Sequence, residues 1–431
     1  MGHRSLTRWF GCIAALALCT MAAPASSETL YVRAGHLVDP EAGQVLDARL
    51  IRIEDGRVVA ITADVPPANG ARVIDWSQLW VLPGLIDAHV HLADFLQTSD
   101  PAEPLKHSAE ETAYLGARNA RVTLEAGFTT VHDVGSYRGM GNIELRNAID
   151  RGDVIGPRID AVGGYVTIPG GGGEVTGLPK GMKVPAEMRM GVASTPPKVR
   201  RKVNLMLDMG ADSIKLIATG AVLTEGTEPG QQELSDAAIA AAVEAASARG
   251  SWVTAHAHGA NGIRAAIRAG VRSIEHASLI DDAGIAQARA RGTVLVMDIY
   301  NGDYIAEVGR RDGWSESILR KNDETTDAQR QGFAKAVRAG VAIAFGTDAG
   351  VFPHGQNARQ FAYMVRWGMT PMQAIQSATT VAAKLLGRER DVGGLSPGHW
   401  ADLIVVEGDP LADISVLERV EHVMKGGVVV R

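Results

Sequence analysis

Two histidines separated by one residue, His89 and His91, end an apolar stretch that begins at Val81. Side chains alternate between the two faces of a β-strand, so both imidazoles project to the same side of the strand that this stretch predicts. Two imidazoles at that spacing can hold one metal ion. A His-x-His pair also occurs by chance in many chains, so its meaning depends on the residues that follow.

Further along the chain, more residues with metal-binding or proton-transferring side chains lie late in predicted strands: Lys215, His256, His276 and Asp348. Any one of them alone is more often a packed, hydrogen-bonded core residue than a ligand, but the set of six favours a shared metal site. The lysine fits such a site only as a neutral amine, and burial near a metal lowers its pKa in that direction. A neutral amine can react with carbon dioxide to form a carbamate, which is an anionic ligand.

A repeated unit of helix and strand must position these side chains. Between Val81 and about Gly387, Ala-rich stretches end in Gly and a β-branched strand follows almost at once, as at Gly127. Gly just past a helix end is typical of a left-handed cap, and alternating strands and helices predict parallel strands. We expect an α/β fold with eight such strands, a (β/α)8 TIM barrel whose active site lies at the C-terminal ends of the strands. The strands are predicted to end near residues 92, 133, 162, 217, 256, 276, 297 and 348.

Both ends of the chain show a different pattern, in which short alternating strands are joined by turns. Residues 26–80 contain a strand from Leu30 to Val38 and a hairpin around Asp55-Gly56. Residues 391–431 contain two more strand segments, near 401–406 and 420–430. We expect the two ends to form one small β-sandwich domain beside a barrel of residues 81–390.

Residues 1–25 are typical of a secretory signal peptide. Arg4 and Arg8 precede an apolar run from Phe10 to Ala23, and small residues suited to cleavage follow. Both cysteines lie inside this segment, so we expect a mature chain with neither disulfide nor thiolate ligand. We therefore expect an exported protein, periplasmic or secreted, with no membrane span. The formal net charge of -6 gives no basic surface for nucleic acid, so a small-molecule substrate is expected.

The order His-x-His, Lys, His, His, Asp on a predicted barrel resembles the amidohydrolase superfamily, in its binuclear subtype with a carboxylated lysine. The likeness extends over nearly the whole mature chain. It includes the segments Gly127–Thr130, Thr254–Gly259, Gly346–Asp348 and Gly394–Gly398.

The resemblance implies two divalent metal ions, for which zinc is favoured over cobalt or manganese. One ion would be held by His89, His91 and Asp348, and the other by His256 and His276. Carboxylated Lys215 and a hydroxide would bridge them. The hydroxide would attack the substrate, and Asp348 would carry its proton to the leaving nitrogen. Family members also often form homo-oligomers, which we expect here.

Within the superfamily, the sequence is most similar to the Xaa-Pro dipeptidase-like and imidazolonepropionase-related branch. This likeness implies cleavage of the amide bond of dipeptides or N-acyl amino acids, with release of the C-terminal residue, and ochratoxin A is one substrate of that kind. A related hydrolase of lactones, cyclic amides or phosphotriesters is the alternative, and an inactive scaffold is a third reading. Mononuclear deaminases and imidazolonepropionase itself resemble this chain less, because they have a glutamate where this chain has Gly259.

Several residues near the predicted strand ends are candidate substrate contacts. His258 shares a face with His256 and could polarise the scissile carbonyl, so we expect it to act in catalysis and in substrate binding. The loops 163–174 and 219–232 are long and well placed to act as lids. The other candidates are Tyr137 and Arg138 for a carboxylate, Val222 and Leu223 for an apolar wall, and His354.

Overall fold

The computed structural model describes residues 1–2, 29–67, 70–96 and 100–431. The predicted signal peptide therefore lies outside the described residues, apart from Met1 and Gly2. Within the described part of the chain, no helix is both long enough and apolar enough to cross a membrane.

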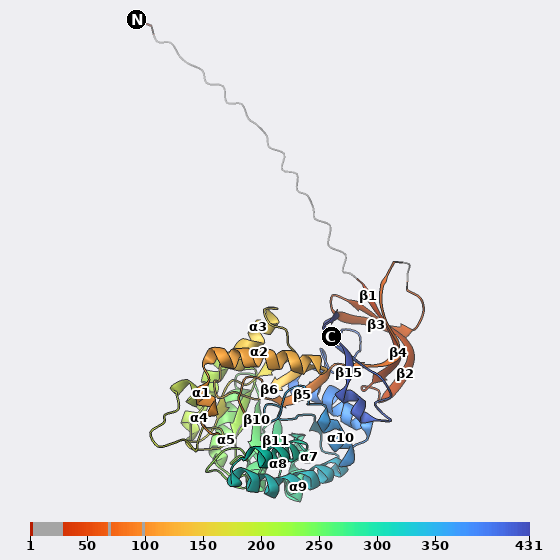
Figure 1. The fold of residues 1–431 in the computed structure, drawn as a ribbon. Helices are drawn as coiled ribbons and strands as arrows, with labels where there is room; N and C mark the ends of the chain where they lie inside the picture. The colour runs from red at the N-terminus through yellow and green to blue at the C-terminus, as the bar shows by residue number, and fades with distance from the viewer. Residues whose placement is uncertain (3–28, 68–69, 97–99) are drawn as a thin grey trace.

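Strands from both ends of the chain join in one seven-stranded sheet (Figure 1). Its members are β1 (Leu30–Asp39), β2 (Gln44–Glu54), β3 (Arg57–Ala63), β4 (Arg72–Pro83), β14 (Leu403–Val406), β15 (Val420–Lys425) and β16 (Val428–Val429). Their order is β16-β15-β14-β4-β1-β2-β3. β4 connects the two ends, because it pairs in parallel with β1 and antiparallel with β14. The sheet contains the strands expected at both ends, whereas a two-layer sandwich and the limits of the predicted domains stay predictions.

The middle of the chain forms parallel strands in two sheets. One sheet consists of β5 (Leu85–Val90), β6 (Phe128–Asp133) and β7 (Arg158–Ala161) in that order. The other has the order β13-β12-β11-β10-β9-β8. Its strands are β8 (Tyr165–Val166), β9 (Ile214–Ile217), β10 (Val253–Ala257), β11 (Ser273–His276), β12 (Val294–Val296) and β13 (Ile343–Ala344). Each of the eight predicted strands is present, and β8 is an additional short strand that the sequence did not predict.

Backbone hydrogen bonds connect the first strand of one sheet to the segment that follows the last strand of the other. The Ala88 N–H donates to the Phe345 carbonyl at 2.8 Å, and the His91 N–H donates to the Ala349 carbonyl at 2.8 Å. These bonds bring the His-x-His segment beside the segment that carries Asp348. The parallel strands are thus established, while closure into a single eight-stranded ring stays a prediction.

Helices follow most of the parallel strands and surround them (Figure 1). α6, α7 and α9 each end at a glycine with positive φ, namely Gly270, Gly292 and Gly340, as the left-handed caps in the sequence predicted. The α-helices are α1 (Glu103–Lys106), α2 (Ala109–Glu125), α3 (Gly141–Asp150), α4 (Pro196–Asp208), α5 (Asp236–Ser247), α6 (Ala260–Ala269), α7 (Asp282–Arg291), α8 (Asn301–Asp312), α9 (Glu316–Ala339), α10 (Arg359–Arg366), α11 (Pro371–Gln376) and α12 (Ala382–Leu386). Short helical turns lie at Ala186–Arg189, Ser377–Val381 and Ile414–Glu418.

Candidate metal centre and substrate pocket

The six predicted metal ligands line one pocket, which has a cavity volume of about 120 Å³. Each of these side chains is buried. Five of them lie in the last two residues of a strand or in the segment just beyond it, whereas Lys215 lies inside β9. The structure therefore brings together the whole set, which is His89, His91, Lys215, His256, His276 and Asp348.

The His-x-His pair faces a shared carboxylate. The Nε2 atoms of His89 and His91 each lie 3.3 Å from Oδ1 of Asp348. The opposite nitrogens are held by other groups: His89 Nδ1 lies 2.7 Å from a Glu275 oxygen, and His91 Nδ1 lies 2.8 Å from the Gly135 carbonyl. A hydrogen bond at one ring nitrogen fixes the orientation of the imidazole and leaves the other nitrogen for a metal. This arrangement suits a cation held by the three residues.

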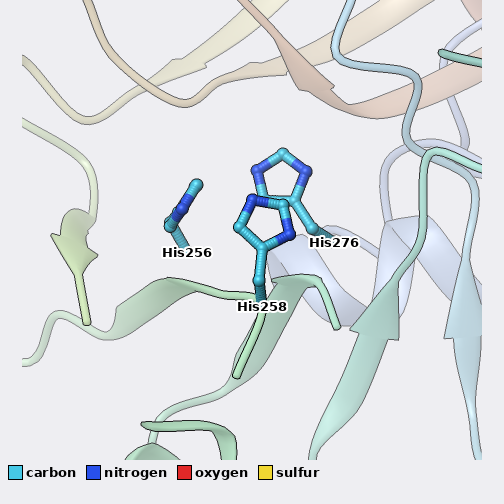
Figure 2. A group of neighbouring side chains, drawn as sticks. All are labelled: His256, His258 and His276. Carbon is cyan, nitrogen blue, oxygen red and sulfur yellow. The ribbon is translucent and has the colours of Figure 1, made fainter. Parts of the chain in front are cut away.

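Three further histidines form a second cluster, which Figure 2 shows with its rings turned toward a common region. The ring centroids of His256, His258 and His276 lie 4.6 to 4.7 Å from one another. His276 Nδ1 lies 3.0 Å from an Asp298 oxygen, His256 Nε2 lies 3.2 Å from the Gly220 carbonyl, and His258 Nδ1 lies 2.8 Å from the Ser278 hydroxyl. One nitrogen of each ring is thus free of these bonds.

Two sets of three side chains have ligand atoms close enough to hold an ion. One set is His89, His276 and Asp348, and the other is His256, His258 and His276, with the atoms of each set within 4.8 Å of one another. His258 therefore lies as near to a possible metal as the predicted ligands do. Burial and the neighbouring charge of His276 lower the pKa of His258 to about 3, so its imidazole is neutral near pH 7.

Lys215 has the environment that a carbamate requires. Its side chain is 1% exposed, and its Nζ atom has no hydrogen-bond partner among the described residues. Burial lowers the pKa of Lys215, which favours the neutral amine that reacts with carbon dioxide. A buried amine without a partner costs free energy.

Two of the proposed ligands have strained backbones. His276 has a φ of 66° and Asp348 a φ of 61°, a left-handed conformation that side chains with a Cβ rarely adopt. This conformation interrupts the alternation of side chains at the end of β11. Glu275 and His276 are neighbours in the sequence, yet both reach His89 or its surroundings. Glu275 contacts His89, and His276 lines the pocket that His89 also lines. Strain of this kind clusters at functional sites.

A network of buried polar groups supports the ligands, and the sequence did not reveal it. Glu275 accepts hydrogen bonds from Thr254 and Ser273 in addition to His89. Burial alone would raise the pKa of Glu275, but hydrogen bonds, first of all the one with His89, lower it. On the other side, Asp298 accepts from Asn301 at 3.2 Å and from Gln329 at 2.8 Å.

Tyr165 is a further pocket residue that the sequence did not reveal. Its hydroxyl donates to an Asp94 oxygen at 2.9 Å and lies 3.1 Å from His91 Nδ1. The tyrosine therefore stands between a buried carboxylate and one of the proposed ligands. It lies on β8, the short strand that the repeat of glycine-capped helices did not predict.

Four of the six predicted substrate contacts line the pocket, namely Tyr137, Val222, Leu223 and His258. Arg138 is not among the lining residues, because its guanidinium binds Glu187 at 3.0 Å and the His107 carbonyl at 2.8 Å. His354 is also absent from the lining. Its Nδ1 lies 3.0 Å from the Thr123 hydroxyl and its Nε2 lies 3.1 Å from the His91 carbonyl, so both nitrogens have partners.

The two loops predicted to act as lids are bonded to each other. The Thr224 hydroxyl donates to the Gly172 carbonyl at 2.7 Å, and the Gly172 N–H donates to Glu233 at 2.9 Å. A Cβ at Gly172 would come within 3.1 Å of Ile217 and of the Ala221 nitrogen, so the loop lies close against its neighbours. These contacts join the two loops, and both loops supply residues that line the pocket. We call the two loops together the pocket roof.

The chain belongs to the amidohydrolase family, whose sequence profile matches residues 80–430. Ochratoxinase from Aspergillus niger is 30% identical over 432 aligned positions, covering 93% of this chain and 86% of that enzyme. The structure is similar to that of a Xaa-Pro dipeptidase with methionine bound in its active site, with 38% identity, a TM-score of 0.87 and coverage of 93% and 99% of the two chains. It is also similar to a prolidase in complex with N-methylphosphonate-L-proline, with 29% identity, a TM-score of 0.86 and coverage of 94% and 99%.

Proposed function

We propose that this chain is a binuclear metal-dependent amidohydrolase that cleaves the amide bond of dipeptides or N-acyl amino acids and releases the C-terminal residue. Ochratoxin A, an N-acyl phenylalanine, is one candidate substrate. The observation that carries the proposal is the buried Lys215 amine, which has no hydrogen-bond partner among the described residues, in a pocket that the five other predicted ligands also line.

The donor set suits two divalent cations, and zinc is favoured because four of the six assigned ligands are imidazoles. We assign His89, His91 and Asp348 to one ion, His256 and His276 to the other, and carboxylated Lys215 to both. Within the described part of the chain, the His89 Nε2 atom also lacks a hydrogen-bond partner, which supports its assignment as a ligand. When bound, the ions would supply an ionised water as the nucleophile near neutral pH and would polarise the amide carbonyl.

Two side chains of the pocket would handle the proton and the carbonyl. Asp348 is held by Asn301, whose amide donates to Oδ2 at 3.0 Å, while Oδ1 faces the His-x-His pair. From this position the carboxylate can take a proton from the attacking water and deliver it to the leaving nitrogen. His258 is a neutral imidazole with one nitrogen at Ser278, so its other nitrogen can donate a hydrogen bond to the developing oxyanion.

Two observations support the proposed substrate class: the similarity of this chain to three hydrolases, and the presence of a glycine at residue 259. An ochratoxinase, a Xaa-Pro dipeptidase and a prolidase all release an amino acid from an amide, and the active site of the dipeptidase holds a bound amino acid, methionine. The mononuclear branch with a glutamate three residues after the strand histidine is disfavoured. At that position this chain has Gly259, and a Cβ there would collide with the Gly230 carbonyl.

Export and self-association are part of the same proposal. We retain the prediction that residues 1–25 direct export to the periplasm or beyond, which N-terminal sequencing of the mature protein would test. We also retain the prediction of a homo-oligomer, which light scattering would test.

The decisive experiment is release of free amino acid from a panel of dipeptides and N-acetyl amino acids, with ochratoxin A included. We expect turnover by the protein loaded with zinc and bicarbonate, loss of turnover after chelation, and recovery when zinc returns. Asp348→Asn should lower kcat by about a hundredfold or more, whereas the exposed control Asp236→Asn should leave it unchanged. Cleavage of lactones, cyclic amides or phosphotriesters instead of the panel would contradict the proposal. Failure to bind two metal ions would favour a scaffold.

A further inference from the structure

A fully buried lysine, Lys321, binds the second of the two loops that form the pocket roof. Lys321 lies on α9 with 0% exposure, and its Nζ atom donates to the carbonyls of Ala221, Thr224 and Thr227 at 3.2, 2.7 and 3.4 Å. No carboxylate lies within ion-pair distance of Lys321 in the described part of the chain. An ammonium has three protons to donate, and here one loop supplies an acceptor for each of them.

The loop that binds Lys321 turns its other side to the pocket. Ala221, Val222, Leu223 and Thr224 all line the cavity that contains the proposed ligands. The loop is also closed on itself, since the Ala221 N–H donates to the Thr227 hydroxyl at 3.1 Å. Fixing its carbonyls therefore helps to fix the pocket-lining side chains, together with the hydrogen bond from Thr224 to the Gly172 carbonyl.

The side chains that this loop presents belong to an apolar wall, which consists of Leu96, Val222, Leu223, Ile305 and Val351. The same residues pack with Trp314 and Ile318 in one apolar cluster, so the wall is continuous with a small core. Apart from Lys215, the described residues that line the pocket include neither lysine nor arginine. A charged substrate side chain against this wall would lose its hydration without gaining a partner.

We propose that Lys321 is a positioning residue that sets the Ala221–Thr227 loop against the pocket, and that the apolar wall held in this way selects substrates whose released residue has an apolar side chain. The inference rests on the proposed function, in which the released residue occupies this pocket. It adds two points to that function: the released residue has an apolar side chain, and Lys321, which does not line the pocket, keeps the apolar wall in place.

Replacing Lys321 tests the positioning role. Lys321→Met keeps the length of the side chain and removes its donors. We expect the KM for N-acetyl-L-leucine to rise about tenfold, with kcat within about twofold and two zinc ions still bound. Lys335→Met on the same helix, whose exposed ammonium pairs with Asp282 at 2.9 Å, is the matched control and should change neither constant. An unchanged KM in a folded, zinc-loaded Lys321→Met protein would overturn the positioning role.

A second variant tests the wall even if Lys321→Met does not fold. Val222 is half-buried at the pocket surface, so Val222→Asp should be tolerated and should attract a basic residue. We expect the wild type to prefer N-acetyl-leucine and N-acetyl-phenylalanine over N-acetyl-aspartate and N-acetyl-arginine. We also expect the leucine-to-arginine ratio of kcat/KM to fall at least about tenfold in Val222→Asp.

The outcomes separate this inference from the function on which it rests. Cleavage of the panel by the wild type without apolar preference, or an unchanged ratio in Val222→Asp, would overturn the inference and leave the proposed amidohydrolase standing. Cleavage of no amide in the panel would overturn both.

Discussion

The ligand cluster and the pocket roof are built in different ways. The proposed ligands lie on strands or in the segments just beyond them, and side chains such as Glu275 and Asp298 orient their imidazoles. The roof is irregular, and its direction depends on hydrogen bonds to distant residues such as Lys321. The positions of the cluster side chains therefore follow from the strands that carry them, whereas the conformation of the roof depends on its contacts with other segments. We expect substitutions in the cluster to affect metal binding and catalysis, and substitutions around the roof to affect selectivity.

The largest effect should come from the centre of the cluster. Lys215→Ala removes the amine that we assign as a shared metal ligand, so we expect kcat/KM to fall by about a thousandfold or more and bound zinc to fall below two ions per chain. Activity assays and metal analysis of the purified protein measure both. Lys384→Ala, at an exposed lysine on α12, is the control. A Lys215→Ala protein with two zinc ions and nearly full activity would contradict the assignment of Lys215 as a shared metal ligand.

An intermediate effect should come from the support of the cluster. Glu275→Gln removes the charge beside His89 and keeps an oxygen of similar shape, so zinc affinity should fall by about 10- to 100-fold. Competition with a chelating dye measures this change. The selectivity of residual activity among apolar and charged substrates should not change, since Glu275 does not line the pocket. Glu244→Gln on α5, whose carboxylate pairs with Arg200 at the surface, is the matched control. Altered selectivity would show that cluster and roof are not separable.

The smallest effect should come from Arg138, which follows the pocket residue Tyr137 in the sequence but does not itself line the pocket. Arg138 binds Glu187 and the His107 carbonyl, so Arg138→Ala should cost about 1 kcal/mol of unfolding free energy. Its KM for N-acetyl-L-leucine should stay within about twofold of the wild type. Thermal unfolding and steady-state kinetics measure the two quantities. A tenfold rise in KM would restore the carboxylate contact that the sequence suggested.

The sequence predicted the strands and the clustering of six side chains because strands have a fixed period. His89 and His91 share a face by alternation, and glycines marked the helix ends that precede six of the eight strands. It did not predict the inward positions of both Glu275 and His276, because a positive φ at His276 breaks that alternation. Gln329 gave no signal either, since only tertiary packing brings the middle of α9 to Asp298.

The same contrast explains which of the predicted substrate contacts line the pocket. Val222 and Leu223 were predicted from their apolar character alone, and the apolar cluster around Trp314 accounts for their place. Arg138 and His354 were predicted from chemistry and proximity in sequence. Their partners, Glu187 and Thr123, are far from them in the chain, and no local pattern announces such pairs.

The pairing of β4 with β14 has a consequence for the way this chain is made. β4 ends at Pro83, and its antiparallel partner begins only at Leu403, so nearly the whole polypeptide must be synthesised before that edge is covered. At roughly 5–20 residues per second, a ribosome would need tens of seconds to supply the missing strand. During that interval an unpaired apolar edge could pair with a neighbouring nascent chain. We therefore expect that the C-terminal strands limit aggregation of the newly made protein, and that loss of the last 30 residues reduces the soluble yield.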